Sequence, residues 1–116
     1  MMFNVGQGIF GRVQFKDGKN PEYDRPYLII EIHEDQIGIL VVSSAAGKSY
    51  RLLNVSSTML INKHYPPFRR KSFVKLDSLT YILISYAQSM KLLDNGSVLD
   101  GAEIRKIQKA IATIEY

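Results

Sequence analysis

The chain has 116 residues, of which 46% are hydrophobic, enough for a single domain (1–116) with its own core. It contains no cysteine, which excludes disulfides, thiolate metal sites and thiol redox chemistry and fits a reducing, cytoplasmic location. The formal net charge of +4 fits an anionic partner and equally fits a small domain that stays soluble through a modest excess of lysine. No apolar run approaches the about 20 residues of a membrane span and no signal-peptide pattern opens the chain, so we expect a soluble protein without a membrane partner.

In the first half of the chain, GIFGRVQFK (8–16) alternates apolar and polar residues as a half-buried strand does, with Gly11 a candidate bulge. A loop rich in Asp, Gly, Asn and Pro follows. PYLIIEIH (26–33) and IGILVVSS (37–44) then predict a β-hairpin of two very apolar strands. Because both strands are apolar on both faces, a second layer must cover them, either from the chain's own helix or from another subunit of a homodimer.

The second half predicts more short strands in SYRLL (49–53), STMLINKHY (57–65) and KSFVKLDSLTYILISY (71–86). Near the C-terminus the pattern becomes helical. Asp100 and Glu103 resemble a capping box, and isoleucines from 104 to 114 share one face, while Glu103, Lys106 and Lys109 take the other. The expected fold is therefore mainly β (α+β), a small barrel of antiparallel strands with a C-terminal α-helix that seals it.

Three catalytic signatures fail on inspection. AAGKSY (45–50) has the end of a phosphate-binding P-loop, but Val42 stands where the motif needs its first glycine. The histidines, His33 and His64, stand in no metal-binding spacing, so we expect no metal and no cofactor. The GxSxG pattern of serine hydrolases is absent.

Cationic and aromatic residues recur on the predicted loops and strand ends. Cations can bind phosphates, and aromatic rings can stack on unpaired bases, so this composition suits single-stranded nucleic acid. An ordinary solvated basic loop has the same composition. The residues are Tyr23, Arg25, Tyr27, Tyr50, Arg51, His64, Tyr65, Phe68, Arg69, Arg70 and Lys71.

Several of these segments, in this order, resemble the PemK/MazF family of toxin endoribonucleases from type II toxin–antitoxin systems. The matching segments are GIFGRVQF, DRPYLIIEI, GILVVSSA, KSFVKLDSLTYI and GAEIRKIQKAIATIEY. The resemblance implies an SH3-like barrel, a homodimer with single-stranded RNA across its interface, a cognate antitoxin on the same groove, and toxicity through cleavage of mRNA.

The resemblance also implies site residues. Arg25 matches the leading catalytic arginine of the family's RP pair. Ser44 matches the hydroxyl that closes the next strand, with Ser43 as the competing alignment. Lys75 and Asp77 match a basic and an acidic position two residues apart. The implied catalytic residues are Arg25, Ser44 and Asp77, and the implied RNA-binding residues are Tyr23, Ser43, His64, Arg69, Arg70 and Lys75.

This chain departs from the family at three places. The stretch before the RP pair reads GKNPEYD, without the family's acidic and glutamine-containing pattern, which affects the expected RNA sequence preference. Ser44 replaces a threonine and keeps the hydroxyl. Lys75 replaces an arginine and keeps the charge without the planar fork.

The expected mechanism needs no metal, because the 2′-hydroxyl of RNA can attack the adjacent phosphate and leave 2′,3′-cyclic phosphate and 5′-hydroxyl ends. In this hypothesis Arg25, held extended by the proline after it, stabilises the charge on the phosphate. Ser44 donates a hydrogen bond to the same phosphate, and either Asp77 or His64 is the base. Two alternatives stay open: a binding module that cuts nothing, and a relative of the barrel-type gyrase poisons, which use a C-terminal tryptophan that this chain lacks.

Overall fold

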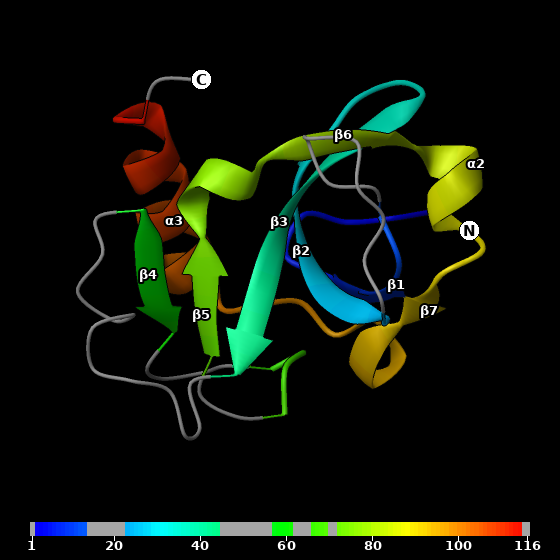
Figure 1. Ribbon diagram of the computed structural model, residues 1–116, viewed down its shortest axis with the longest axis horizontal. Coiled ribbons are helices and arrows are strands. Elements are labelled where there is room, and N and C mark those ends of the chain that lie inside the picture. Colours follow the sequence, from blue (N-terminus) through cyan, green and yellow to red (C-terminus); the bar gives the residue numbers. More distant parts are fainter. Residues whose placement is uncertain (1, 14–22, 45–56, 62–65, 70–71, 115–116) are drawn as a thin grey trace.

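The computed structural model describes residues 2–13, 23–44, 57–61, 66–69 and 72–114, in which an antiparallel sheet carries the C-terminal helix (Figure 1). The strands are β1 (Gly8–Gly11), β2 (Arg25–Ile32), β3 (Gln36–Ser44), β4 (Thr58–Ile61), β5 (Ser72–Lys75), β6 (Thr80–Leu83) and β7 (Lys91–Leu92). The helices are α2 (Ile84–Ala87) and α3 (Gly101–Ala112), with short 3-10 turns η1 (Leu76–Ser78) and η2 (Leu93–Gly96).

The strands pair in the order β4-β5-β3-β2-β1-β7, and β6 pairs with β3. Strand β3 is shared, because its first half pairs with β6 and its second half with β5. The mainly β, α+β class and the C-terminal helix are therefore confirmed. Among the described strands the path is open at β4 and β7, so closure into a barrel is not confirmed.

The β2–β3 hairpin forms the centre of the sheet, as its apolar sequence predicts. Tyr27 pairs with Val41, and the register shifts between Ile29 and Glu31, where β2 has a bulge. Gly11, the predicted bulge, instead pairs regularly with Arg25. A Cβ on Gly11 would lie 2.8 Å from the terminal methyl of Met90, so a larger residue there would require the Met90 side chain to shift.

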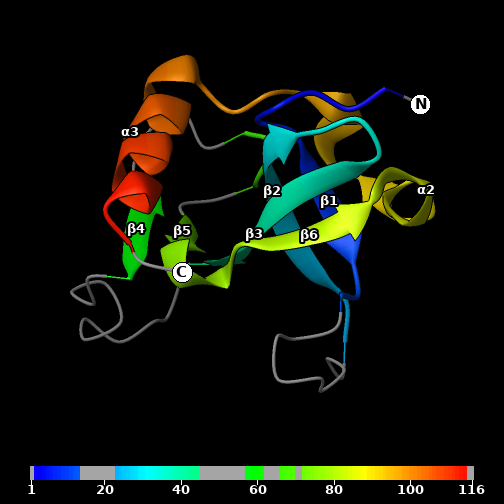
Figure 2. The same ribbon diagram turned by 90° about the horizontal axis from the view of Figure 1, so that it is seen from above.

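Both faces of the hairpin are covered by the chain itself. One face, which includes Leu28 and Leu40, packs in the cluster that contains Ile107 of α3. The other face, which includes Ile29 and Ile39, packs in a cluster with residues of the N-terminal segment and of α2 and its surroundings. Figure 2 shows α3 beside β4 and β5 and α2 at the far end of the molecule. The doubly apolar hairpin therefore needs no second subunit to bury it.

Helix α3 begins where the sequence predicts, at Asp100, whose side chain accepts a hydrogen bond of 3.0 Å from the Ala102 amide. Ile107 is fully buried against the sheet. The prediction that Glu103 lies on the solvent face is wrong: its residue is 7% exposed, and its carboxylate lies 3.6 Å from Lys106 Nζ. The ammonium group of Lys106 offsets part of the cost of burying this carboxylate.

The segment 71–86, predicted to carry one or two strands, contains two, β5 and β6, separated by η1. The last residues of this segment, ISYA, form the single turn of α2. The predicted strand 49–53 lies outside the described residues. None of the helices in the described part of the chain is long and apolar enough to cross a bilayer.

Candidate nucleic-acid interface

Arg25 is the first residue of β2, and its side chain is held by the tyrosine two positions earlier. Its Nη2 donates a hydrogen bond of 3.0 Å to the Tyr23 hydroxyl, and its guanidinium carbon lies 4.8 Å from the centre of the Tyr23 ring. The proline after Arg25 keeps the backbone extended at this point. A ring contact, a hydrogen bond and a stiff strand together limit the positions that the guanidinium can take.

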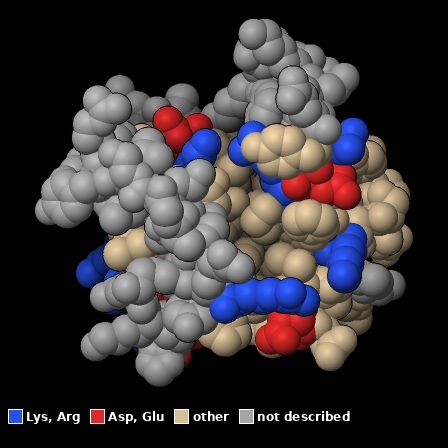
Figure 3. Space-filling model, turned by 60° about the horizontal axis from the view of Figure 1, so that its bottom comes forward, with Lys and Arg blue, Asp and Glu red and all other residues tan. Residues whose placement is uncertain are grey.

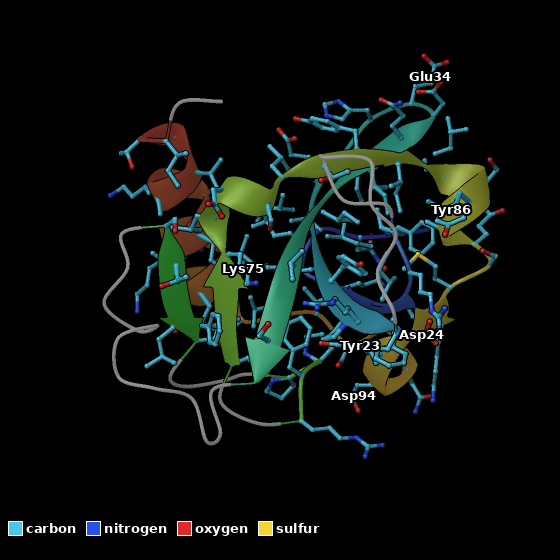
Figure 4. All side chains as sticks on the ribbon, in the orientation of Figure 1. Tyr23, Asp24, Glu34, Lys75, Tyr86 and Asp94 are labelled. Carbon is cyan, nitrogen blue, oxygen red and sulfur yellow. The ribbon has the colours of Figure 1, made fainter. Side chains whose placement is uncertain are left out.

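Further polar residues gather at the same place, from the end of β1 and from α2. Asp24 accepts a hydrogen bond of 3.0 Å from Arg12 Nε, and the Tyr86 hydroxyl donates to the Arg12 carbonyl. Figure 4 shows Tyr23 and Asp24 together at the start of β2. We name this group the arginine cluster: Arg12, Tyr23, Asp24, Arg25, Tyr27 and Tyr86.

Tyr27 is the buried member of the arginine cluster. Its hydroxyl accepts a hydrogen bond of 3.3 Å from the Val13 amide. Burial raises the pKa of the Tyr27 hydroxyl above its ordinary value near 10. The Val13 amide and the charge of Arg25 act in the opposite direction, while Tyr86 and Asp24 raise that pKa further. The hydroxyl of Tyr27 is therefore within electrostatic reach of Asp24, Arg25 and Tyr86.

The predicted serines lie at the end of the neighbouring strand, β3. The β2–β3 register runs to the pair Tyr27 and Val41. Beyond that pair the two strands diverge toward the bottom of Figure 1. Side chains alternate along a strand, so Ser43 stands on the same face as Val41, and Arg25 on the same face as Tyr27. Ser43, the competing alignment, thus lies on the same sheet face as Arg25.

Ser44 pairs with Ser72 of β5, and its side chain lies outside the described part of the structure.

The predicted pair Lys75 and Asp77 lies at the other end of β5. Strand β5 begins at Ser72, opposite Ser44, and ends at Lys75, and Asp77 follows in η1 with an exposed side chain. Figure 4 places Lys75 away from Tyr23 and Asp24. The structure therefore brings Arg25 together with Asp24 and Tyr23, and it does not bring Asp77 into that group.

A groove of about 650 Å³ opens between the start of β2 and the start of β5. Its walls are largely apolar, with cations and one carboxylate around them. Figure 3 views the molecule from this side, where Lys and Arg side chains are spaced around an uncharged surface with acidic groups between them. The lining residues are Phe10, Pro26, Pro66, Pro67, Phe68, Arg69, Ser72, Lys91, Leu93 and Asp94.

The groove includes Arg69, predicted to bind RNA, whereas His64 and Arg70 lie outside the described residues. The sequence reasoning missed Asp24 and Lys91. Asp24 directly precedes Arg25 in the sequence, and this adjacency could have marked it as a member of the same site. Lys91 lies on a two-residue strand, for which the sequence carries no periodic pattern.

The described residues include no group of three or more histidine, aspartate and glutamate side chains arranged to hold a metal ion. The charged groups of this region include the guanidinium of Arg25, the carboxylate of Asp24, and the cations and the Asp94 carboxylate of the groove. This arrangement suits a polyanion with planar groups.

No protein-family model matches this chain, and no curated protein is significantly similar to it.

Proposed function

We propose that this protein is an endoribonuclease that cleaves single-stranded RNA by attack of the 2′-hydroxyl on the neighbouring phosphate. The observation that carries the proposal is the position of Arg25, held by Tyr23 at the start of an extended strand whose next residue, Pro26, lines a groove bordered by cations. A guanidinium can donate two hydrogen bonds to one phosphate and keeps its charge at all relevant pH values. The phosphate gains negative charge in the transition state, and Arg25 stabilises that charge.

The two proton transfers can be assigned within the arginine cluster. The Asp24 carboxylate accepts the proton of the attacking 2′-hydroxyl, while the bond from the 2′-oxygen to phosphorus forms. The bond from phosphorus to the 5′-oxygen breaks, and the 5′-oxygen takes the proton of the Tyr23 hydroxyl. The Tyr23 oxygen accepts the Arg25 hydrogen bond, so its own proton can point elsewhere. Asp24 then gives up a proton to solvent and Tyr23 regains one, which restores both groups.

The residues predicted from the family resemblance keep secondary places in this proposal. Ser43 or Ser44 donates a hydrogen bond to the phosphate from the end of β3. Asp77 and His64 remain candidate bases, and we favour Asp24 over Asp77 because Asp24 belongs to the arginine cluster and Asp77 lies beyond the far end of β5. Membership of the PemK/MazF family belongs to the same proposal. So do an SH3-like barrel, a homodimer, a cognate antitoxin and a cytoplasmic location.

The experiment is cleavage of a labelled single-stranded RNA in excess chelator. We expect cleavage that continues under chelation and leaves 2′,3′-cyclic phosphate and 5′-hydroxyl ends. A matched oligonucleotide with one 2′-deoxyribose at a mapped cleavage site should stay intact at that site only, because the attacking group is missing there. Cleavage at the deoxyribose position, or products with 5′-phosphate ends, would contradict the mechanism.

The second candidate is a module that binds single-stranded nucleic acid without cutting it. One observation favours it: Asp24, the carboxylate of the arginine cluster, already accepts a hydrogen bond of 3.0 Å from Arg12 Nε, so one of its acceptor positions is taken before a substrate binds. RNA binding without any cleavage by the purified protein would support this candidate over the nuclease.

A further inference from the structure

The groove beside Arg25 has the parts of a nucleotide site. Its volume of about 650 Å³ falls in the range of roughly 300 to 1,000 Å³ that is usual for small-molecule sites. Its walls come from separate parts of the chain: β1, the start of β2, residues 66–69, Ser72 at the start of β5, and β7 with η2.

Three of the lining side chains form a row across the sheet. Phe10 of β1 pairs with Pro26 of β2 on one side and with Lys91 of β7 on the other. Directly paired residues of neighbouring strands project to the same face. The row therefore sets an aromatic ring between a proline and a lysine. A base can stack on the ring while the ammonium group contacts a phosphate.

The groove also adjoins the proposed cleavage site. Pro26, in its wall, follows Arg25 directly, and consecutive Cα atoms lie about 3.8 Å apart. Side chains alternate along β2, so Arg25 and Pro26 project to opposite faces at the same strand end. A strand of RNA that crosses this end can place a phosphate at Arg25 and a neighbouring base in the groove.

Asp94 supplies the directional polar group of this groove. It lies in η2 with φ of 48°, followed by Asn95 with φ of 53°, so two successive non-glycine residues adopt the left-handed conformation. This conformation costs free energy in an L-residue, and such positions concentrate at functional sites. The Ser97 hydroxyl donates a hydrogen bond of 2.5 Å to Asp94 Oδ2 and orients the carboxylate. Each carboxylate oxygen has two acceptor positions, so Asp94 can still accept from a ligand.

The chemistry of a carboxylate distinguishes among the four bases. Guanine alone presents two adjacent donors, N1–H and the 2-amino group, which match two acceptor oxygens. Cytosine and adenine place a ring acceptor next to their amino group, and uracil places carbonyl oxygens on both sides of N3–H. These acceptors repel a carboxylate.

We propose that this groove binds a guanine nucleotide of the RNA: the base stacks on Phe10 and donates to the Asp94 carboxylate, and Lys91 and Arg69 contact phosphates. The inference rests on the proposed function, since it names the nucleotide that binds beside the cleavage site.

The test measures binding and not cleavage, so the two proposals can fail separately. The probes are short single-stranded RNAs with 2′-O-methyl groups, which block the attacking hydroxyl, and they differ at one position that carries guanine, inosine, adenine, cytosine or uracil. We expect guanine to bind about tenfold more tightly than inosine, which lacks the 2-amino donor. Equal affinity for the guanine and inosine probes would overturn the inference without any protein variant.

The matched variants are Asp94→Asn and Glu34→Gln. Asparagine tolerates the left-handed backbone of position 94, and it replaces one acceptor oxygen by a donor. We expect Asp94→Asn to lose the preference for guanine over inosine. Glu34→Gln removes the same charge from an exposed position that Figure 4 places at the opposite end of the molecule, and it should keep the preference. A guanine preference that survives Asp94→Asn would refute the role of Asp94. A guanine preference that Asp94→Asn removes, in a protein that cleaves no RNA, would support the groove and count against the nuclease.

Discussion

The Tyr23 hydroxyl offers a sharp test of how Arg25 is held. Tyr23→Phe keeps the ring under the guanidinium, 4.8 Å from its carbon, and removes the hydroxyl that accepts the bond of 3.0 Å. A hydrogen bond to a charged group contributes about 1.5 to 3 kcal/mol, and the exposed position of Tyr23 favours the lower end. At about 1.4 kcal/mol per factor of ten, we expect the loss of this hydrogen bond alone to slow cleavage about tenfold, and the loss of the proton that Tyr23 gives to the leaving oxygen to slow it further.

The assay is single-turnover cleavage of a labelled RNA with enzyme in excess, so that product release does not limit the rate. Tyr81→Phe is the matched control. Tyr81 lies on the distant strand β6, and its hydroxyl also donates a hydrogen bond to a charged group, the Glu31 carboxylate, at 2.5 Å. It should cleave at the wild-type rate. If Tyr23→Phe and Tyr81→Phe both cleave as the wild type does, Tyr23 neither positions Arg25 nor supplies a proton.

Three further predictions concern stability. Ile107→Ala should lower the free energy of unfolding by about 2 to 5 kcal/mol in a urea titration, since Ile107 is fully buried. Lys109→Ala, at an exposed position of α3, is the control, and a loss of comparable size there would contradict the packing of α3. Asp100→Ala should cost about 1 kcal/mol by removing the cap of α3, and an unchanged midpoint would show that the cap contributes nothing. Above about pH 10 the unfolded chain loses the Tyr27 proton that the native state retains, so the free energy of unfolding should fall as pH rises. Tyr27→Phe should make the free energy of unfolding depend less on pH in this range. An unaltered pH dependence would exclude Tyr27 as its source.

The parts of the fold that the sequence predicts well are those with long apolar patterns. The β2–β3 hairpin and α3 lie within one or two residues of their predicted ranges, because burial on both faces and a capping aspartate leave few other arrangements. The sequence leaves open what covers the hairpin, and the structure answers that the chain covers it from both sides. The bulge predicted at Gly11 is absent, and the close neighbour of Gly11 is Met90, which lies far along the chain and leaves no local signal.

The candidate site could be predicted only in part. The role of Arg25 is predicted through the family resemblance, and Tyr23, two residues before it, is found by its nearness in the sequence. The groove could not be predicted, since it depends on β7 and η2, whose few residues carry no periodic signal. In addition, β7 pairs with β1, which lies far away in the sequence. The position of Asp77 beyond the far end of β5 likewise depends on the sheet register and not on the spacing of residues in the chain.

The central claim is that the guanidinium of Arg25 stabilises the charge that develops on the phosphate. Its most direct test is the single-turnover rate of RNA cleavage by Arg25→Ala in chelator, beside Arg105→Ala, which removes an exposed arginine from α3. We expect Arg25→Ala to be at least about a hundredfold slower, and Arg105→Ala to match the wild type. Cleavage by a folded Arg25→Ala protein at the wild-type rate would contradict the account.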